Sequence, residues 1–301
     1  MKSLAAYIMR GPVQATLVAW LTGLLSLMIP FVGLLSSATL GLVTLRYGSR
    51  TGARIGLQAG LGCLILCWLA LGSPWPALVI TLVLWLPVWG LAAVLRHSRS
   101  LALTTQLAGV VGVVAILAVH ALAGDPTAYW LRLLEPFQTV LMQSGGVDGP
   151  TLQKVFAELA PWMTGAFALG LMLQTLLGLL IGRWWQGQLY NPGGFGTDFR
   201  AFRLHPVFGV VGLLLVVAVG FMPGPGLVPD LLLVLFPLWL FQGLAVIHAL
   251  LATRGAHVGW AVGVYVLLIV FMPQTLVLVT CLGLVDTWAD LRARLGRRPP
   301  A

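Results

Sequence analysis

The stretch Leu101–Ala123, LALTTQLAGVVGVVAILAVHALA, decides the fold class, because its 23 residues include no aspartate, glutamate, lysine or arginine. A helix that spans a bilayer needs about 20 mainly apolar residues to cross a hydrocarbon core about 30 Å thick. Arg96 and Arg99 stand just before this run and Asp125 follows it. We therefore interpret the run as one membrane span with polar ends.

The rest of the chain has the same character. Of its 301 residues, 59% are hydrophobic and 8% are charged, against about 25% charged residues in an ordinary soluble domain. A chain with so few polar residues cannot cover a water-soluble globule. The sequence predicts an all-α, polytopic transmembrane helical bundle that forms a single transmembrane domain over residues 1–301, with the lipid bilayer as partner.

Nine apolar runs mark the expected membrane segments. They are Val13–Ile29, Phe31–Leu45, Ile55–Leu71, Ala77–Leu95, Leu101–Ala123, Trp162–Ile181, Val207–Met222, Leu227–Leu251 and Val258–Val285. Prolines interrupt Val13–Leu45 and Val258–Val285, so each of these stretches is either a helical pair or one long kinked helix. This gives about 8–10 membrane segments.

The basic residues predict the orientation. We assume a cytoplasmic N-terminus and an outer turn at Pro30. Of the lysines and arginines that flank the first eight runs, eleven then lie inside, and two, Arg132 and Lys154, lie outside. Positive residues concentrate on the cytoplasmic side of membrane proteins. If Val258–Val285 turns back near Pro273, the four tail arginines also lie inside. We therefore favour ten segments and a cytoplasmic, arginine-rich tail at 286–301.

The segment 124–161 is the one sizeable insertion between spans, on the outer side. We expect two amphipathic helices, Tyr129–Gln143 and Leu152–Leu159, joined by a turn at Gly145–Pro150. The first has one apolar face, formed by Trp130, Leu133, Leu134, Phe137 and Leu141. We favour a connector lying at the membrane interface over a lid above the outer mouth.

Small residues at intervals of four allow helix backbones to approach closely in lipid. Gly52, Gly56 and Gly60 form such a ladder, and a similar string recurs at Gly255–Gly263. Tight packing within the chain is the favoured interpretation, and a weak internal repeat is the alternative. A further row is a candidate either for docking of another membrane subunit or for packing within the chain: Ala15, Ala19 and Gly23.

The most polar cytoplasmic stretch is Leu189–Arg203, LYNPGGFGTDFRAFR. Its Asn-Pro-Gly-Gly sequence is typical of a turn, and glycine-rich backbone near arginines can receive an anion. No Walker motif is present, so we favour a loop that docks against a partner or against helix ends over a nucleotide site. The candidate loop residues are Asn191, Gly193, Gly194, Arg200 and Arg203.

Intramembrane polar groups usually mark function. No charged residue lies near the middle of any expected span, which argues against a carrier built on a buried carboxylate. Uncharged polar residues remain, and each is more typical of an interhelical hydrogen bond than of a ligand site. As a set, four of them are candidates for lining the cavity of a small solute: Gln106, His120, Gln174 and Gln242.

Several function classes are excluded at this level. The net charge of +9 comes from basic residues at span ends, which argues against nucleic acid. The three cysteines lie in apolar runs, without the spacing of a disulfide framework or a metal site. Asp286 and Asp290 stand beside tail arginines and indicate a cytoplasmic cap. No catalytic motif occurs, so we expect neither an enzyme nor a cofactor.

Three elements together resemble one family. These are the arginine-glycine entry Leu45–Gly60, the loop Tyr190–Arg203 and the ending Asp286–Arg292, and they resemble the YybS-like bacterial membrane proteins over nearly the whole chain. That family is distantly similar to the S components of energy-coupling-factor transporters. The resemblance implies a protein of the bacterial inner membrane that binds a small solute and docks on a transmembrane coupling subunit.

These observations leave three hypotheses for the function. The leading one is a non-enzymatic, transport-related membrane component that captures a small solute from outside. The second is a structural or assembly factor that acts through the loop Asn191–Arg203 and the tail. The third is a lipid-handling protein, suggested by the tryptophan-rich interfaces and the amphipathic insertion.

Overall fold

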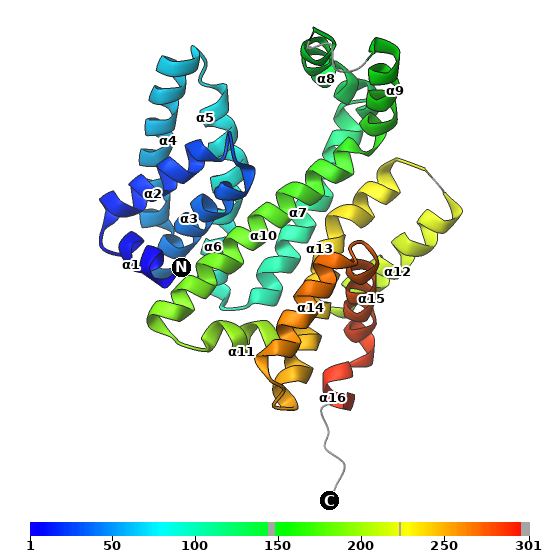
Figure 1. The fold of residues 1–301 in the computed structure, drawn as a ribbon. Coiled ribbons are helices and arrows are strands. Elements are labelled where there is room, and N and C mark those ends of the chain that lie inside the picture. Colours follow the sequence, from blue (N-terminus) through cyan, green and yellow to red (C-terminus); the bar gives the residue numbers. More distant parts are fainter. Residues whose placement is uncertain (144–147, 223, 296–301) are drawn as a thin grey trace, which may run out of the picture. The chain divides into compact units, whose positions relative to one another are not determined.

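The computed structural model describes residues 1–143, 148–222 and 224–295 of the chain (Figure 1). Within these ranges 87% of the residues are helical and none lies in a strand. The predicted all-α class is therefore confirmed for the described residues. Half of the predicted turn Gly145–Pro150, and Arg297 and Arg298 of the predicted tail, lie outside the described residues.

The chain divides into two compact units, where the sequence predicted one domain. Unit 1 comprises Met1–Ala108 and Leu171–Phe202, and unit 2 comprises Gly109–Gly170 and Arg203–Ala301. Neither unit is continuous in sequence, because two long helices each contribute one part to each unit. These are α7 (Leu101–Leu122) and α10 (Met163–Tyr190).

Unit 1 contains the N-terminal helices together with the second part of α10. In chain order they are α1 (Lys2–Ile8), α2 (Pro12–Leu25), η1 (Pro30–Val32), α3 (Gly33–Tyr47), α4 (Ser49–Leu71), α5 (Trp75–Val79), η2 (Ile80–Trp85), α6 (Leu86–Ser98) and α11 (Gly194–Arg200). The run Val13–Leu45 is thus a helical pair, because Pro30 begins a new helical turn after α2 has ended. The hydroxyl of Ser36 donates back to the carbonyl of Ala19, as expected for antiparallel neighbours.

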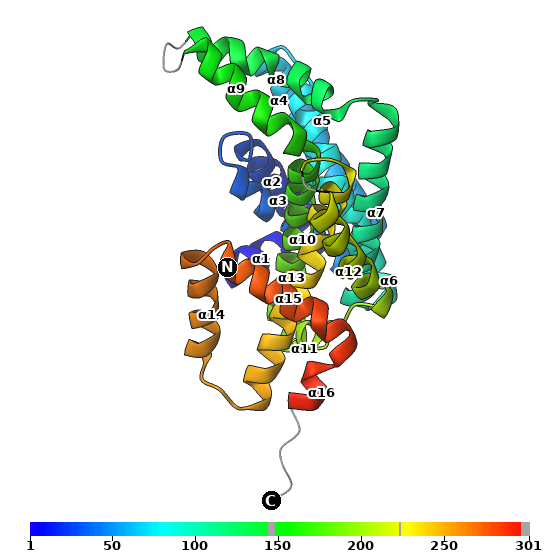
Figure 2. The same ribbon diagram turned by 90° about the vertical axis from the view of Figure 1, so that its right-hand side faces the viewer.

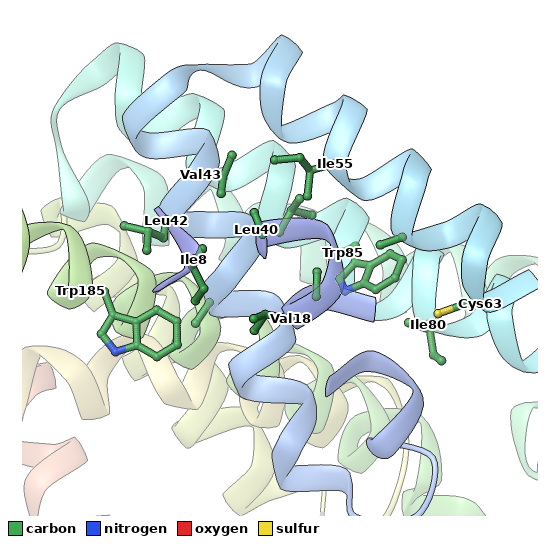
Figure 3. Close-up of a cluster of buried hydrophobic side chains, with 14 of the residues drawn as sticks. Ile8, Val18, Leu40, Leu42, Val43, Ile55, Cys63, Ile80, Trp85 and Trp185 are labelled. Atoms are coloured by element: carbon green, nitrogen blue, oxygen red, sulfur yellow. The ribbon is translucent and has the colours of Figure 1, made fainter. Parts of the chain in front are cut away.

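Helix α3 lies at the centre of unit 1, and the apolar cluster of this unit forms around it (Figure 3). Leu40, Leu42 and Val43 of α3 are buried there, together with Trp85 of η2 and Trp185 of α10. A side chain at Gly182 of α10 would meet the backbone of α3. Glycine therefore lets α10 lie directly against α3.

Unit 2 contains the insertion 124–161 and the C-terminal helices. Its further elements are α8 (Pro126–Gln143), α9 (Gly149–Leu159), η3 (Ala160–Trp162), α12 (Pro206–Phe221), α13 (Leu227–Thr253), α14 (Val258–Val270), α15 (Gln274–Ala289) and α16 (Leu291–Leu295). The two predicted amphipathic helices are present as α8 and α9, which lie side by side (Figures 1 and 2). Helix α9 continues through η3 into α10, so it is not a separate insertion helix.

Helices α13 and α15 cross with their backbones in direct contact. A Cβ atom at Gly283 of α15 would overlap the carbonyl oxygen of Trp239 and lie 2.6 Å from the backbone nitrogen of Gly243. A Cβ atom at Gly243 would in turn overlap the carbonyl oxygen of Val279. These two glycines permit an approach that no larger residue allows, and they bring polar side chains on the two helices together.

The last apolar run, Val258–Val285, is two helices. The chain turns at residues 271–273 between α14 and α15 (Figure 2). Arg203, before α12, forms an ion pair of 2.7 Å with Asp290, after α15. Since α12 leads away from Arg203 and α13 leads back, α14 and α15 must together return the chain to the same end of the unit. The predicted turn near Pro273 agrees with this arrangement.

Five helical stretches are long and apolar enough to cross a membrane, judged by length and composition over the described residues. They are Ser49–Leu71, Trp75–Ser98, Leu101–Leu122, Gly149–Tyr190 and Leu227–Thr253. Four shorter apolar helices accompany them: Pro12–Leu25, Pro206–Phe221, Val258–Val270 and Gln274–Ala289.

Candidate functional site

A histidine and an aspartate meet inside the apolar helices of unit 2. His120 lies in the last turn of α7 and Asp230 in the first turn of α13, and their Nε2 and Oδ2 atoms are 2.8 Å apart. Asp230 is only 1% exposed, whereas the His120 side chain is 21% exposed. An ionisable pair is therefore buried at one end of two long apolar helices, with its imidazole partly open.

The packing of α7 against α13 explains why these two residues meet. A Cβ atom at Gly109 of α7 would lie 2.7 Å from a methyl group of Leu238. From Gly109 to His120 the chain advances by eleven residues along α7, and from Leu238 back to Asp230 it covers eight along α13. At about 1.5 Å per residue, these antiparallel steps cover about 16.5 Å and about 12 Å, which brings the histidine and the aspartate within one helical turn of each other.

The two oxygens of the Asp230 carboxylate have different neighbours. Its Oδ2 atom contacts His120, and the buried Oδ1 atom faces the Gly165 backbone of α10. A Cβ atom at Gly165 would overlap Oδ1, so the glycine lets the α10 backbone close over it. A carboxylate buried among apolar helices is unfavourable unless it is paired.

The insertion is anchored beside this pair. The indole Nε1 of Trp130 on α8 donates to the hydroxyl of Thr164, which is buried on α10 next to Gly165, at 2.8 Å. The Trp130 ring also packs against Phe167 of α10, with ring centroids 5.6 Å apart. Helix α8 is therefore attached within one residue of the segment that covers Asp230.

A second polar cluster of unit 2 lies where α13 crosses α15. The Gln242 side-chain amide donates to Asp286 Oδ2 at 2.9 Å, and the Gln242 carbonyl accepts from the backbone N–H of Leu204. Arg292 also donates to Asp286 Oδ2, at 2.8 Å, and the Leu291 N–H donates to Asp286 Oδ1. Both Gln242 and Asp286 are fully buried. Both carboxylate oxygens of Asp286 accept hydrogen bonds, so this cluster is a hydrogen-bonded contact between α13 and α15.

The predicted cap at the tail is present. Asp286 accepts the first free N–H of α16, and Asp290 Oδ1 accepts the N–H of Ala293. The Arg203 guanidinium donates to the other oxygen of Asp290. This hydrogen bond holds the pKa of Asp290 below its usual value.

The four residues predicted to line a cavity are spread over both units. His120 and Gln242 both lie in unit 2. Asp230, the partner of His120, precedes Gln242 by twelve residues on α13, which is about 18 Å along the helix. Gln174 lies in unit 1, where its amide donates to the hydroxyl of Ser37 at 3.3 Å. Gln106 is half-buried on α7 within unit 1. A shared cavity stays a prediction, and two of the four, His120 and Gln242, each contact a buried aspartate.

The predicted small-residue faces pack within unit 1. Ala15 and Ala19 are each 1% exposed, and a Cβ atom at Gly23 would lie 2.9 Å from the Trp85 ring. Of the two alternatives for this row, packing within the chain is therefore the one observed. A partner subunit that docks on this unit would need another surface.

The first glycine ladder also packs inside unit 1, and the second does not pack in the same way. A Cβ atom at Gly52 would overlap the Thr44 hydroxyl, whereas one at Gly56 or Gly60 would make contacts of 3.3 Å or more. At Gly255 and Gly263 a Cβ atom would meet nothing within 4 Å. The two matching strings therefore pack differently in the structure, and the weak internal repeat stays a prediction.

The loop that follows α10 is fastened to its own unit. Asn191 and Gly193 form the turn before α11, where Gly193 has a positive φ of 86° and the N–H of Gly194 donates to the Asn191 carbonyl. Arg183 of α10 pairs with Asp198 at 2.6 Å. Arg200 ends α11, and its guanidinium would be 3.0 Å from a Cβ atom at Gly196. The loop docks on helix ends, which was one of the two arrangements favoured from the sequence.

No protein-family model, curated protein or solved structure matches this chain.

The sequence interpretation missed Asp230. The signal was present, because Asp230 is the only charged residue in the apolar run Leu227–Leu251. It lies near the start of that run, at the same expected face of the membrane as His120, near the end of Leu101–Ala123. An aspartate and a histidine at the same depth in two spans are candidates for a pair.

Proposed function

We propose that this chain is a polytopic membrane protein with its N-terminus and C-terminus in the cytoplasm, in the inner membrane of a bacterium. The apolar helices, the basic residues at their ends and the return of α15 to the end where α12 begins support this topology. In it, α7 runs outward and α13 runs inward, so that His120 and Asp230 lie near the outer face.

Within that membrane we propose a non-enzymatic, transport-related role, in which the protein captures a small solute from the outer side. One observation carries this proposal: a carboxylate buried among apolar helices and paired with a partly exposed histidine. Ionisable groups inside membrane helices are unfavourable and mark ion or substrate pathways. The proposal does not depend on Ala15, Ala19 and Gly23 as a docking face.

Similarity to the YybS-like family and to S components is part of this proposal. Its basis is the resemblance of the loop and of the two terminal motifs, and it implies a transmembrane coupling subunit as partner. Such a subunit would have to contact residues other than the small row of α2.

Native mass spectrometry of the protein, extracted gently from its own membranes, tests the proposal. We expect a stoichiometric small molecule or a coupling subunit on the wild-type protein. The small molecule should be lost in Asp230→Asn and in His120→Leu. Asp198→Asn is the matched control, because it makes the same chemical change in an ion pair of unit 1, and it should retain the ligand.

The outcomes separate the hypotheses. A wild-type protein that carries no small molecule contradicts the transport proposal and favours an assembly role, which should then be lost in Arg200→Ala. Bound phospholipid alone, retained in Asp230→Asn, favours lipid handling. One observation supports that last candidate: on α8 the apolar side chains of Phe137 and Val140 are about two thirds exposed.

A further inference from the structure

We infer that His120 and Asp230 form a proton-binding site, in which a single proton is shared between Nε2 and Oδ2 and its loss loosens the contact of α7 with α13. This inference rests on the proposed function, because it names the ligand of the same site. Its starting points are the 2.8 Å distance between the two atoms and the burial of the aspartate.

Space at the site favours a proton over a larger cation. Gly165 brings the α10 backbone against Oδ1, and the Leu233 side chain lies beside the same glycine. Among the described residues no third histidine, cysteine, aspartate or glutamate joins the pair to hold a metal ion. A proton needs neither a cavity nor several oxygen ligands, so it binds without any movement of the helices.

Charge balance favours one proton per pair. With one proton the pair is neutral overall, either as imidazolium and carboxylate or as imidazole and carboxylic acid, and both forms keep the Nε2–Oδ2 hydrogen bond. Without a proton, Asp230 is a lone anion among apolar side chains, which is strongly unfavourable. With two protons the pair is a buried cation. The neutral pair is therefore the state that these apolar helices stabilise.

The proton has a route through the histidine. When a water molecule takes one of the two ring protons of the His120 imidazolium, the N–H electron pair stays on the ring nitrogen, Asp230 remains a carboxylate and the imidazole keeps one N–H. The contact between α7 and α13 then changes from a hydrogen bond between opposite charges to a weaker one between a neutral imidazole and a carboxylate. The partial exposure of the imidazole provides access to water, while Asp230 is closed.

Few other charges act on the pair. The parts of α7, α10 and α12 that belong to unit 2 contain no titratable group except His120, and on α13 the next after Asp230 is His248. On the insertion, Asp125 already accepts two backbone N–H groups of α8, and Arg132 bonds to a backbone carbonyl. Asp125 and Arg132 are exposed, and so are the other titratable groups of α8 and α9, which are Tyr129, Glu135, Lys154 and Glu158. Solvent therefore screens them.

Infrared difference spectroscopy of the full-length protein in lipid nanodiscs tests the inference. The sample is switched between about pH 3 and about pH 9, a range that covers the ordinary pKa values of both side chains. We expect a part of the carboxyl band and a part of the imidazole band that change together. Because the pair shares one proton, Asp230→Asn and His120→Gln should each remove this coupled part of both bands, whereas Asp198→Asn should leave the coupled part as in the wild type.

Isotope labelling keeps the test independent of whether a variant folds. In wild-type protein with ¹³C-labelled aspartate, the part of the carboxyl band that changes together with the imidazole band must shift. If that part does not shift, or if the coupled imidazole change survives in a folded Asp230→Asn protein, the inference is overturned.

The two proposals fail separately. If Asp230→Asn loses a bound solute while the infrared changes are independent of Asp230, the solute site stands and the shared proton is wrong. If the two bands change together but no solute is ever bound, the proton site stands and the transport proposal is wrong.

Discussion

Replacing Gly283 by alanine should destabilise the protein strongly. The new Cβ atom would lie 2.6 Å from the Gly243 nitrogen, whereas ordinary van der Waals contact begins at 3.4 Å. It would also overlap the Trp239 carbonyl oxygen. Both neighbours are backbone atoms, which cannot rotate away, so α13 and α15 must separate by about 0.8 Å or more.

The expected size follows from packing energetics. Overpacking a well-packed core destabilises by about 1–3 kcal/mol, and the backbone contact places Gly283→Ala at the upper end of that range. A change of about 3 kcal/mol alters the unfolding equilibrium roughly 150-fold, since each 1.4 kcal/mol is a factor of about ten. Separation of the helices should also lengthen the hydrogen bond between Gln242 and Asp286.

Equilibrium unfolding of the purified protein in mixed micelles, followed by tryptophan fluorescence, measures the effect. Gly263→Ala is the matched control, because Gly263 lies inside α14 and a Cβ atom there meets nothing within 4 Å. Alanine is a better helix former than glycine by about 0.5–1 kcal/mol, so the control should be neutral or slightly stabilising. If Gly283→Ala is as stable as Gly263→Ala, the close crossing of α13 and α15 is wrong.

Three further outcomes follow from the same structure. Gln242→Leu removes the partners of two buried groups and should lower the free energy of unfolding by about 1–3 kcal/mol; unchanged stability, with loss of a bound solute, would instead support the predicted lining role. Arg203 lowers the pKa of Asp290. The ion pair should therefore stabilise the protein fully at pH values above 3.8, the ordinary pKa of aspartate, and this contribution should vanish as the pH falls through the lowered pKa. The stability difference between wild type and Asp290→Asn, measured against pH, checks this, and a difference that grows on acidification would contradict it. In a Cys281→Ala background, a cysteine at Gly124 should react with an impermeant thiol reagent on whole cells, and one at Gly255 only after permeabilisation; the reverse pattern would invert the proposed topology.

The sequence by itself determined the properties that depend on neighbouring residues. Uninterrupted apolar runs such as Leu101–Ala123 identified the long helices, because the length and hydropathy of a helix are properties of a continuous segment. The position of Pro273 together with the tail arginines predicted the turn between α14 and α15. The amphipathic pattern of Tyr129–Gln143 predicted α8, and the Asn-Pro-Gly-Gly sequence predicted the turn before α11.

Only the tertiary structure decided which groups meet. His120 and Asp230 are 110 positions apart, and their contact depends on the antiparallel packing of α7 and α13. Gln242 resembled a cavity-lining residue in sequence, but because α15 crosses α13 there, its side chain forms hydrogen bonds to Asp286 and to the backbone of Leu204. The row around Ala19 had the pattern of a docking face, but α3 and η2 cover it. Hydropathy is a local property, whereas the partner of a buried polar group is chosen by helix packing between distant segments.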